Sequence, residues 1–184
     1  MTRQELREDA RRNREALVAV AREVFQEQGT EASLRDVARR AGVGIGTLYR
    51  HFPHRTALLE AVLAAGIDGL RDHADELMTN DDPGEALNLW MTRLATRSAA
   101  YRGLPGEVLA AMKDESSDLH RSCTQMQAAA GRLLARAQSV GAVRAGLTGG
   151  DVVTMCAAAG WVQQFGGEES SERMLAVLAN GLAP

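Results

Sequence analysis

The sequence predicts an all-α fold of about nine helices, in which a small N-terminal three-helix domain precedes a larger helical body. Apolar residues recur at helical spacing along most of the 184 residues, and no alternating strand pattern occurs. Only 4% of the residues are aromatic, whereas alanine and leucine, which favour helices, are abundant. Residues 33–52 add the pattern of two short helices joined by a tight turn.

The first helix is expected from about Arg14 to Gln28, because an apolar stripe runs through this segment and Gly29 follows it. Residues 1–12 are rich in Arg and Glu but lack that periodicity. We therefore expect them to form a mobile arm or a frayed helix start, most of it solvated.

Two short helices are expected next, at Leu34–Arg40 and at about Ile45–Phe52. Ser33 and Asp36 have the spacing of a capping box at the start of the first. Gly42 supplies the turn, in a left-handed conformation that a side chain would penalise. The residues expected to face a shared small core are Leu34, Val37, Ala38, Ala41, Val43 and Leu48. This pattern predicts a helix-turn-helix, whose second helix enters the DNA major groove.

The side chains left facing outward from this unit are mostly hydrogen-bond donors. Phosphate oxygens need donors, and base edges need short or planar polar groups. Ordinary solvated charges on a surface helix pair are the alternative, which the combination of cap, turn and core period disfavours. The outward residues are Arg35, Arg39, Thr47, Tyr49, Arg50, His51 and Arg55.

Pro53 is expected to stop the second of these helices, and a long helix should follow from about His54 to Met78. The turn sequence at residues 80–84 then breaks the chain. Further helices are expected at about 85–101, 106–113, 117–140, 151–165 and 170–182. Gly166 and Gly167 separate the last two.

Charge and hydropathy limit the classes of protein to which this chain can belong. No run approaches the roughly 18 apolar residues of a membrane-spanning helix, and the N-terminus lacks the apolar segment of a secretory signal. A cytoplasmic protein without membrane association is therefore expected. The net charge is -3, but residues 1–60 carry 11 Arg against 9 acidic residues, so the basic part holds the helix-turn-helix.

No pattern for catalysis or metal binding stands out. Cys123 and Cys156 lie far apart, and the four histidines lack partners at metal-ligand spacing. The glycines of residues 42–46 differ from a dinucleotide loop, because the third glycine comes one residue early and a helix precedes. We expect no enzyme activity, no metal and no cofactor.

The segment from Asn13 to about Val62 resembles the DNA-binding domain of the TetR family of bacterial transcriptional repressors. The family pattern has a first helix ending in Phe-x-x-x-Gly, then Thr-Leu-Tyr-x-His-Phe, then a basic residue opening a long helix. The matching residues here are Phe25, Gly29, Thr47, Leu48, Tyr49, His51, Phe52 and Arg55. The resemblance implies a DNA-binding domain at 1–53 and an effector-binding and dimerisation domain at 54–184.

The resemblance also implies roles in binding double-stranded operator DNA. Thr47, Tyr49, His51 and Arg55 match family positions that contact phosphates, and Arg35 and Tyr49 could reach bases or sugars. The start of the recognition helix, where bases are read, is formed by Gly44, Ile45 and Gly46, with Arg50 further along. Ile45 could pack on a thymine methyl group, and the glycines permit close backbone approach.

For the body, the resemblance implies a homodimer and a small-molecule effector that releases a repressor from DNA. The helices at 151–165 and 170–182 are apolar enough to form the dimer interface, or else to complete the monomer core. The candidate lining of an effector pocket is Trp90, Met91, Leu94, Tyr101, Met112, Met126 and Trp161, although each residue type also suits plain core. A regulator without an inducer, controlled by a partner protein, remains the alternative.

Overall fold

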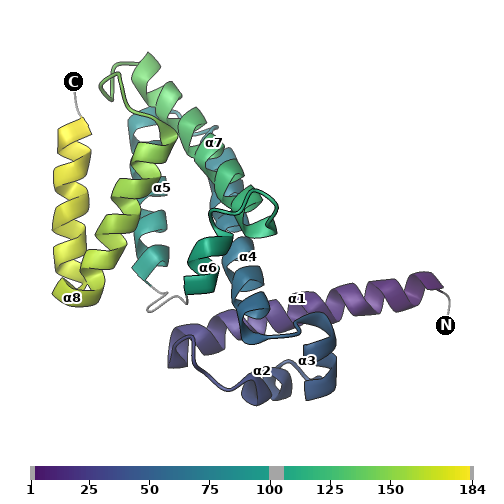
Figure 1. The fold of residues 1–184 in the computed structure, drawn as a ribbon. Coiled ribbons are helices and arrows are strands. Elements are labelled where there is room, and N and C mark those ends of the chain that lie inside the picture. Colours follow the sequence, from purple (N-terminus) through teal and green to yellow (C-terminus); the bar gives the residue numbers. More distant parts are fainter. Residues whose placement is uncertain (1–2, 100–105, 183–184) are drawn as a thin grey trace.

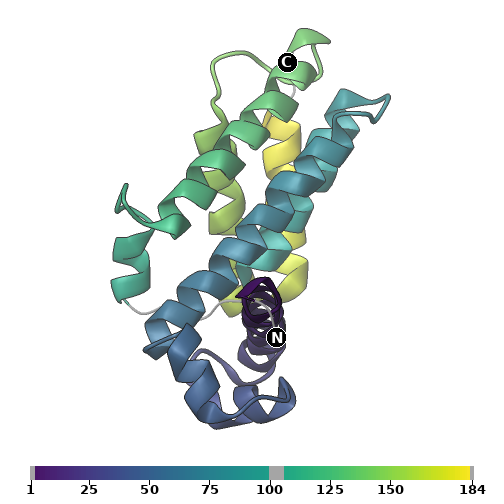
Figure 2. The same ribbon diagram turned by 90° about the vertical axis from the view of Figure 1, so that its right-hand side faces the viewer.

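The computed structural model describes residues 3–99 and 106–182, and every regular element in these ranges is a helix. The helices α1 to α3 form a head at one end of the molecule, and α5, α7 and α8 form the body (Figure 1). The long helix α4 joins head and body (Figure 2). The bounds are α1 Arg3–Gln28, α2 Leu34–Arg40, α3 Ile45–His51, α4 Arg55–Leu77, α5 Pro83–Ala99, α6 Gly106–Ala111, α7 Asp118–Ser139 and α8 Gly149–Leu182. The all-α prediction is confirmed for the described residues.

The first helix begins earlier than expected. Residues 3–12 continue α1 and project beyond the rest of the head, where an arm or frayed start was predicted (Figure 1). This part has no apolar stripe, so periodicity could not reveal it. Ion pairs along the helix surface support it instead, between Arg11 and Glu15 at 2.8 Å and between Arg12 and Glu8 at 3.7 Å.

The last helix is broken at the two glycines that were expected to separate two helices. Gly167 has a φ of 77° and a ψ of 176°, which interrupts α8 inside its range Gly149–Leu182. The two halves fold back against each other as a helical hairpin (Figure 1). The buried Ser171 hydroxyl donates to the Ala159 carbonyl across the hairpin at 3.0 Å. The predicted pair of C-terminal helices is therefore present, with a kink between them.

The helix α4 contributes to two apolar cores. Its first half packs Leu58, Leu59 and Val62 into the head core, which also reaches Leu119 of α7. Its second half packs Leu70 into the body core, where the Trp90 indole donates to the Leu70 carbonyl at 2.9 Å. A rotation of α4 would therefore change the side-chain packing of both the head and the body.

Candidate nucleic-acid interface

The turn between α2 and α3 has the geometry that the sequence predicts. Gly42 has a φ of 70°, and the amide of Val43 donates to the Ala38 carbonyl at 3.0 Å. The amide of Gly42 donates to the Arg39 carbonyl at 3.2 Å, which completes a Schellman motif at the end of α2. The buried residues Leu34, Val37, Ala38 and Leu48 hold the two helices together, with Ala41 and Val43 partly buried beside them.

The predicted capping box is not formed. Ser33 is the N-cap residue of α2, but its side chain makes no capping hydrogen bond. The Asp36 carboxylate is bound instead by Arg39 and by Arg40, whose Nε lies 2.9 Å away. These contacts, led by the hydrogen bond from Arg39, hold the pKa of Asp36 below its usual value. Two neighbouring guanidinium groups therefore outcompete the backbone amide for this carboxylate.

The recognition helix α3 turns its polar side chains outward. Leu48 is fully buried, whereas Tyr49 is 48% exposed and Arg50 is exposed beside it. Thr47 and His51 are half-buried. One short helix thus carries five of the predicted contacts, namely Ile45, Thr47, Tyr49, Arg50 and His51. Ile45 is also packed against the head core, which limits its reach towards a base.

The glycines at the start of α3 are not required by the fold itself. Gly44 and Gly46 are exposed, and neither has a positive φ. A Cβ atom added to either residue would meet nothing within 4 Å. Gly46 lies inside α3, where glycine is less favourable than alanine, whereas Gly44 is the N-cap residue, a position that glycine suits.

A hollow of about 510 Å³ lies beside α3 at the start of α4. Three predicted DNA contacts, Arg35, Tyr49 and Arg55, come together around it although they lie on three different helices. The other lining residues are Ser33, Leu34, Pro53 and His54. Arginine and tyrosine donors around a hollow next to a recognition helix suit a phosphate group.

Arg55 has a second role that the sequence did not reveal. Its Nη1 donates to the carbonyls of Thr30 and Ala32, each at 2.7 Å. The guanidinium therefore fastens the loop between α1 and α2 to the start of α4. A contact to a phosphate would have to use the remaining nitrogens of the same side chain.

His54 also contributes to this region, at the start of α4. It is the N-cap residue of α4, and its Nδ1 accepts a hydrogen bond from the Ala57 amide at 3.1 Å. Because Nδ1 accepts, the proton of the neutral ring must sit on Nε2, which is then free to act as a donor towards a phosphate. Histidine is not among the preferred N-cap residues, so capping preferences gave no signal here.

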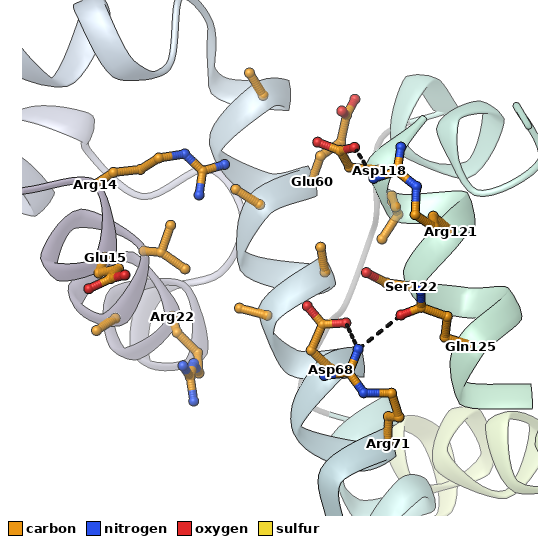
Figure 3. A pocket seen from close by; sticks show the side chains of 17 residues that line it. Arg14, Glu15, Arg22, Glu60, Asp68, Arg71, Asp118, Arg121, Ser122 and Gln125 are labelled. Atoms are coloured by element: carbon orange, nitrogen blue, oxygen red, sulfur yellow. Dashed lines mark hydrogen bonds and ion pairs between the residues drawn. The ribbon is translucent and has the colours of Figure 1, made fainter. Parts of the chain in front are cut away.

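The described residues among those predicted to line an effector pocket lie in three different places. Trp90, Met91, Leu94 and Met126 are buried in the body core. Met112 packs partly against the head core, and Trp161 is 59% exposed on α8. Tyr101 lies outside the described residues. A groove of about 650 Å³ follows α4 between α1 and α7 (Figure 3), and none of the six described candidates lines it.

Other kinds of site receive no support from the described part of the chain. It contains no group of three or more His, Cys, Asp or Glu residues placed to hold a metal ion. None of the helices in residues 3–99 and 106–182 has the length and apolar character needed to span a bilayer.

The fold and this outward-facing helix define a helix-turn-helix transcriptional regulator. Residues 17–62 match the family model of bacterial regulatory proteins of the tetR family, and residues 82–184 match the C-terminal domain of SbtR-like transcriptional regulators. The chain belongs to the TetR family of bacterial transcriptional regulators.

Solved structures of related proteins have a similar fold along nearly the whole length of this chain. A TetR transcriptional regulator from Streptomyces coelicolor is 32% identical, with a TM-score of 0.73 over 93% of this chain and 98% of its own. A TetR regulatory protein from Mycobacterium vanbaalenii is 34% identical, with a TM-score of 0.66 over 97% and 99%. Among curated proteins, an HTH-type transcriptional regulator of Staphylococcus aureus (strain USA300) is 34% identical over 73 residues, or 39% of this chain. That match spans only 40% of the length of the relative.

Proposed function

We propose that the protein is a homodimeric repressor that binds a palindromic operator and is released from it by a small-molecule effector. In this proposal, residues 1–53 form the DNA-binding domain, and residues 54–184 form the effector-binding and dimerisation domain. The observation that carries it is the outward face of α3, where Tyr49 and Arg50 are exposed beside two glycines that the fold does not need.

We expect DNA recognition to combine close approach of the α3 backbone to the DNA with contacts between polar or charged side chains and the phosphates. The glycines at positions 44 and 46 let the start of α3 lie deep in the major groove. Arg35, Tyr49, His54 and Arg55 flank this helix and can bind the adjacent phosphates. Base discrimination would then rest on few side chains, mainly Thr47 and Arg50 of α3, together with the shape of the operator.

Dimerisation would use the outer face of α8. Val152, Cys156 and Ala159 face inward and are fully buried. Ala157 and Ala158 are exposed on the same helix, and Val177 is 70% exposed on the second half of the hairpin. With Trp161, these residues give α8 an exposed apolar surface, which a second copy would cover. The helix α8 lies at the outer edge of the body (Figure 1).

Selection of genomic fragments with the purified protein tests the proposal. The source genome is sheared, bound fragments are recovered and sequenced, and the enriched sites are compared. We expect a palindrome whose half-sites lie about 34–36 Å apart, one turn of DNA. Compounds made or degraded by the products of adjoining genes are then tested for release of the protein. No enrichment above background would contradict the proposal, and release only by another protein would favour the alternative.

A further inference from the structure

The projecting part of α1 and the helix α8 lie on opposite sides of the molecule (Figure 1). The free end of α1 extends beyond the head on the side where α3 lies, whereas α2 lies further back along the head (Figure 1). In a dimer that pairs through α8, the free ends of both copies of α1 therefore point away from the two-fold axis, past the two recognition helices.

The contact between Arg14 and Phe52 shows which way one face of α1 points. The guanidinium of Arg14 lies over the ring of Phe52, 5.2 Å from its centroid, and Phe52 directly follows the last residue of α3. Figure 3 shows Arg14 reaching out from α1 towards the neighbouring helix α4. The face of α1 that carries Arg14 is thus turned towards the C-terminal end of the recognition helix.

Arg7 lies on the same face of α1 but beyond the head. Seven residues separate it from Arg14, and over a heptad the direction of the side chain on an α-helix changes by only about 20°. The two residues are therefore displaced mainly along the helix axis, by about 10 Å at 1.5 Å per residue. Arg11 lies between them, and all three residues are exposed. We call Arg7, Arg11 and Arg14 the arginine face of α1.

The acidic residues around Arg7 lie on other sides of the helix. Glu5 and Asp9 are each two residues from Arg7, and two residues turn an α-helix by about 200°, so both are opposite to it. Arg12 lies off the arginine face and pairs with Glu8 at 3.7 Å and with Asp9 at 3.8 Å. Arg7 forms no ion pair with a described residue. Its exposed guanidinium is thus available to an anion outside the chain.

We propose that the arginine face of α1 binds phosphates of the DNA that flanks the operator, with Arg7 making the outermost contact. The inference rests on the proposed function, because docking of α3 and pairing through α8 set the direction of α1 on the DNA. Along a duplex parallel to α1, about 10 Å corresponds to about three base pairs at 3.4 Å each. The Arg7 contact therefore falls outside the base pairs that α3 reads, and it does not depend on their sequence.

Fluorescence anisotropy of the full chain with two duplexes tests the contact. One duplex ends at the outermost base pairs of the enriched palindrome, and the other carries about five further base pairs on each side, enough to include the expected contact. We expect the longer duplex to bind more tightly. Its slope of log affinity against log salt should be steeper by roughly two units, since a dimer contributes one Arg7 at each end.

Two substitutions of equal charge separate the arginine face from net charge. Arg7→Gln should remove the advantage of the longer duplex and the extra salt dependence. Arg12→Gln is the matched control, because it removes one positive charge from the same part of α1 but from another face, and it should keep the advantage. Neither side chain belongs to the head core, so circular dichroism should show unchanged helical content in both variants.

Three results would overturn the inference. The first is equal affinity of the unaltered chain for the two duplexes. The second is an equal loss of the advantage in Arg7→Gln and Arg12→Gln, which would indicate a general effect of charge. The third is an advantage that changes when the flanking base pairs are replaced, because phosphate contacts carry no sequence information directly.

The repressor proposal can fail separately from this contact. If the protein binds the short palindrome as a dimer but gains nothing from the longer duplex, the repressor proposal stands and the contact is wrong. If no palindrome is enriched, the repressor proposal is wrong, and the two variants are compared on a duplex of random sequence. A shallower salt slope in Arg7→Gln than in Arg12→Gln would then support the arginine face, and equal slopes would overturn it.

Discussion

The guanidinium of Arg14 lies over the ring of Phe52, so that the middle of α1 supports the end of the recognition helix α3. The two residues are far apart in the sequence, and Phe52 is almost fully buried. This contact joins the helix that spans the head to the helix that faces DNA.

The contact between Arg14 and Phe52 should be measurable in a double-mutant cycle. We expect Arg14→Gln, Phe52→Leu and the double variant to give a coupling free energy of about 0.5–1 kcal/mol in urea unfolding. Arg14→Gln should also weaken operator binding, although the side chain lies at the head–body groove. A coupling energy of zero would mean that the two side chains are neighbours without mutual stabilisation.

Replacement of Gly46 should separate stability from DNA binding. Because a Cβ atom at this position meets open space, Gly46→Ala should raise the free energy of unfolding by about 0.5–1 kcal/mol. The same methyl group should lower operator affinity by obstructing close approach to DNA. Gly69→Ala in α4 is the matched control, since its Cβ also meets open space and it lies outside the head. Equal operator affinity in both variants would remove Gly46 from the interface.

Arg55 should contribute to stability and to DNA binding separately. Arg55→Ala leaves the carbonyls of Thr30 and Ala32 without their donor, which should cost about 1–3 kcal/mol of unfolding free energy. If the side chain also binds a phosphate, the slope of log affinity against log salt should become shallower by roughly one unit. A stability loss with an unchanged slope would restrict Arg55 to its structural role.

The proposed dimer face can be tested by one charged side chain. Ala158 is exposed on α8, so Ala158→Glu should leave the monomer folded but place a charge inside the dimer interface. Sedimentation velocity should then show a monomer where the unaltered chain is a dimer. Ala128→Glu, at an exposed position of α7, is the control and should remain dimeric. Dimerisation of both variants would exclude this face.

The sequence was sufficient to predict the helix-turn-helix because local signals agree there. The turn at Gly42 and the buried face of Leu34, Val37 and Leu48 follow from conformational freedom and periodicity, which act over a few residues. The early start of α1 could not be predicted in this way, because ion pairs rather than an apolar stripe support residues 3–12. Ser33 is the N-cap residue as predicted, but the capping box was wrong, because the Asp36 carboxylate has arginine partners that a capping rule does not weigh.

The sites of the body form where segments distant in the sequence meet. The types of residue in those segments do not indicate which of them will meet. Trp90 and Met91 are predicted pocket residues, and both are buried in the body core, where the same properties also favour packing. The groove along α4 is built partly from alanines, which give no sequence signal for a cavity. Its other lining comes from α1 and α7, which only the fold brings beside α4.

The affinity of the purified protein for the enriched operator, compared with a single half-site across a range of salt concentrations, tests the central claim most directly. A dimer that docks two copies of α3 should bind the palindrome far more tightly than the half-site, with affinity falling steeply as salt rises. Equal affinity for both DNAs, or an affinity independent of salt, would contradict the account of a dimeric regulator that reads DNA through α3.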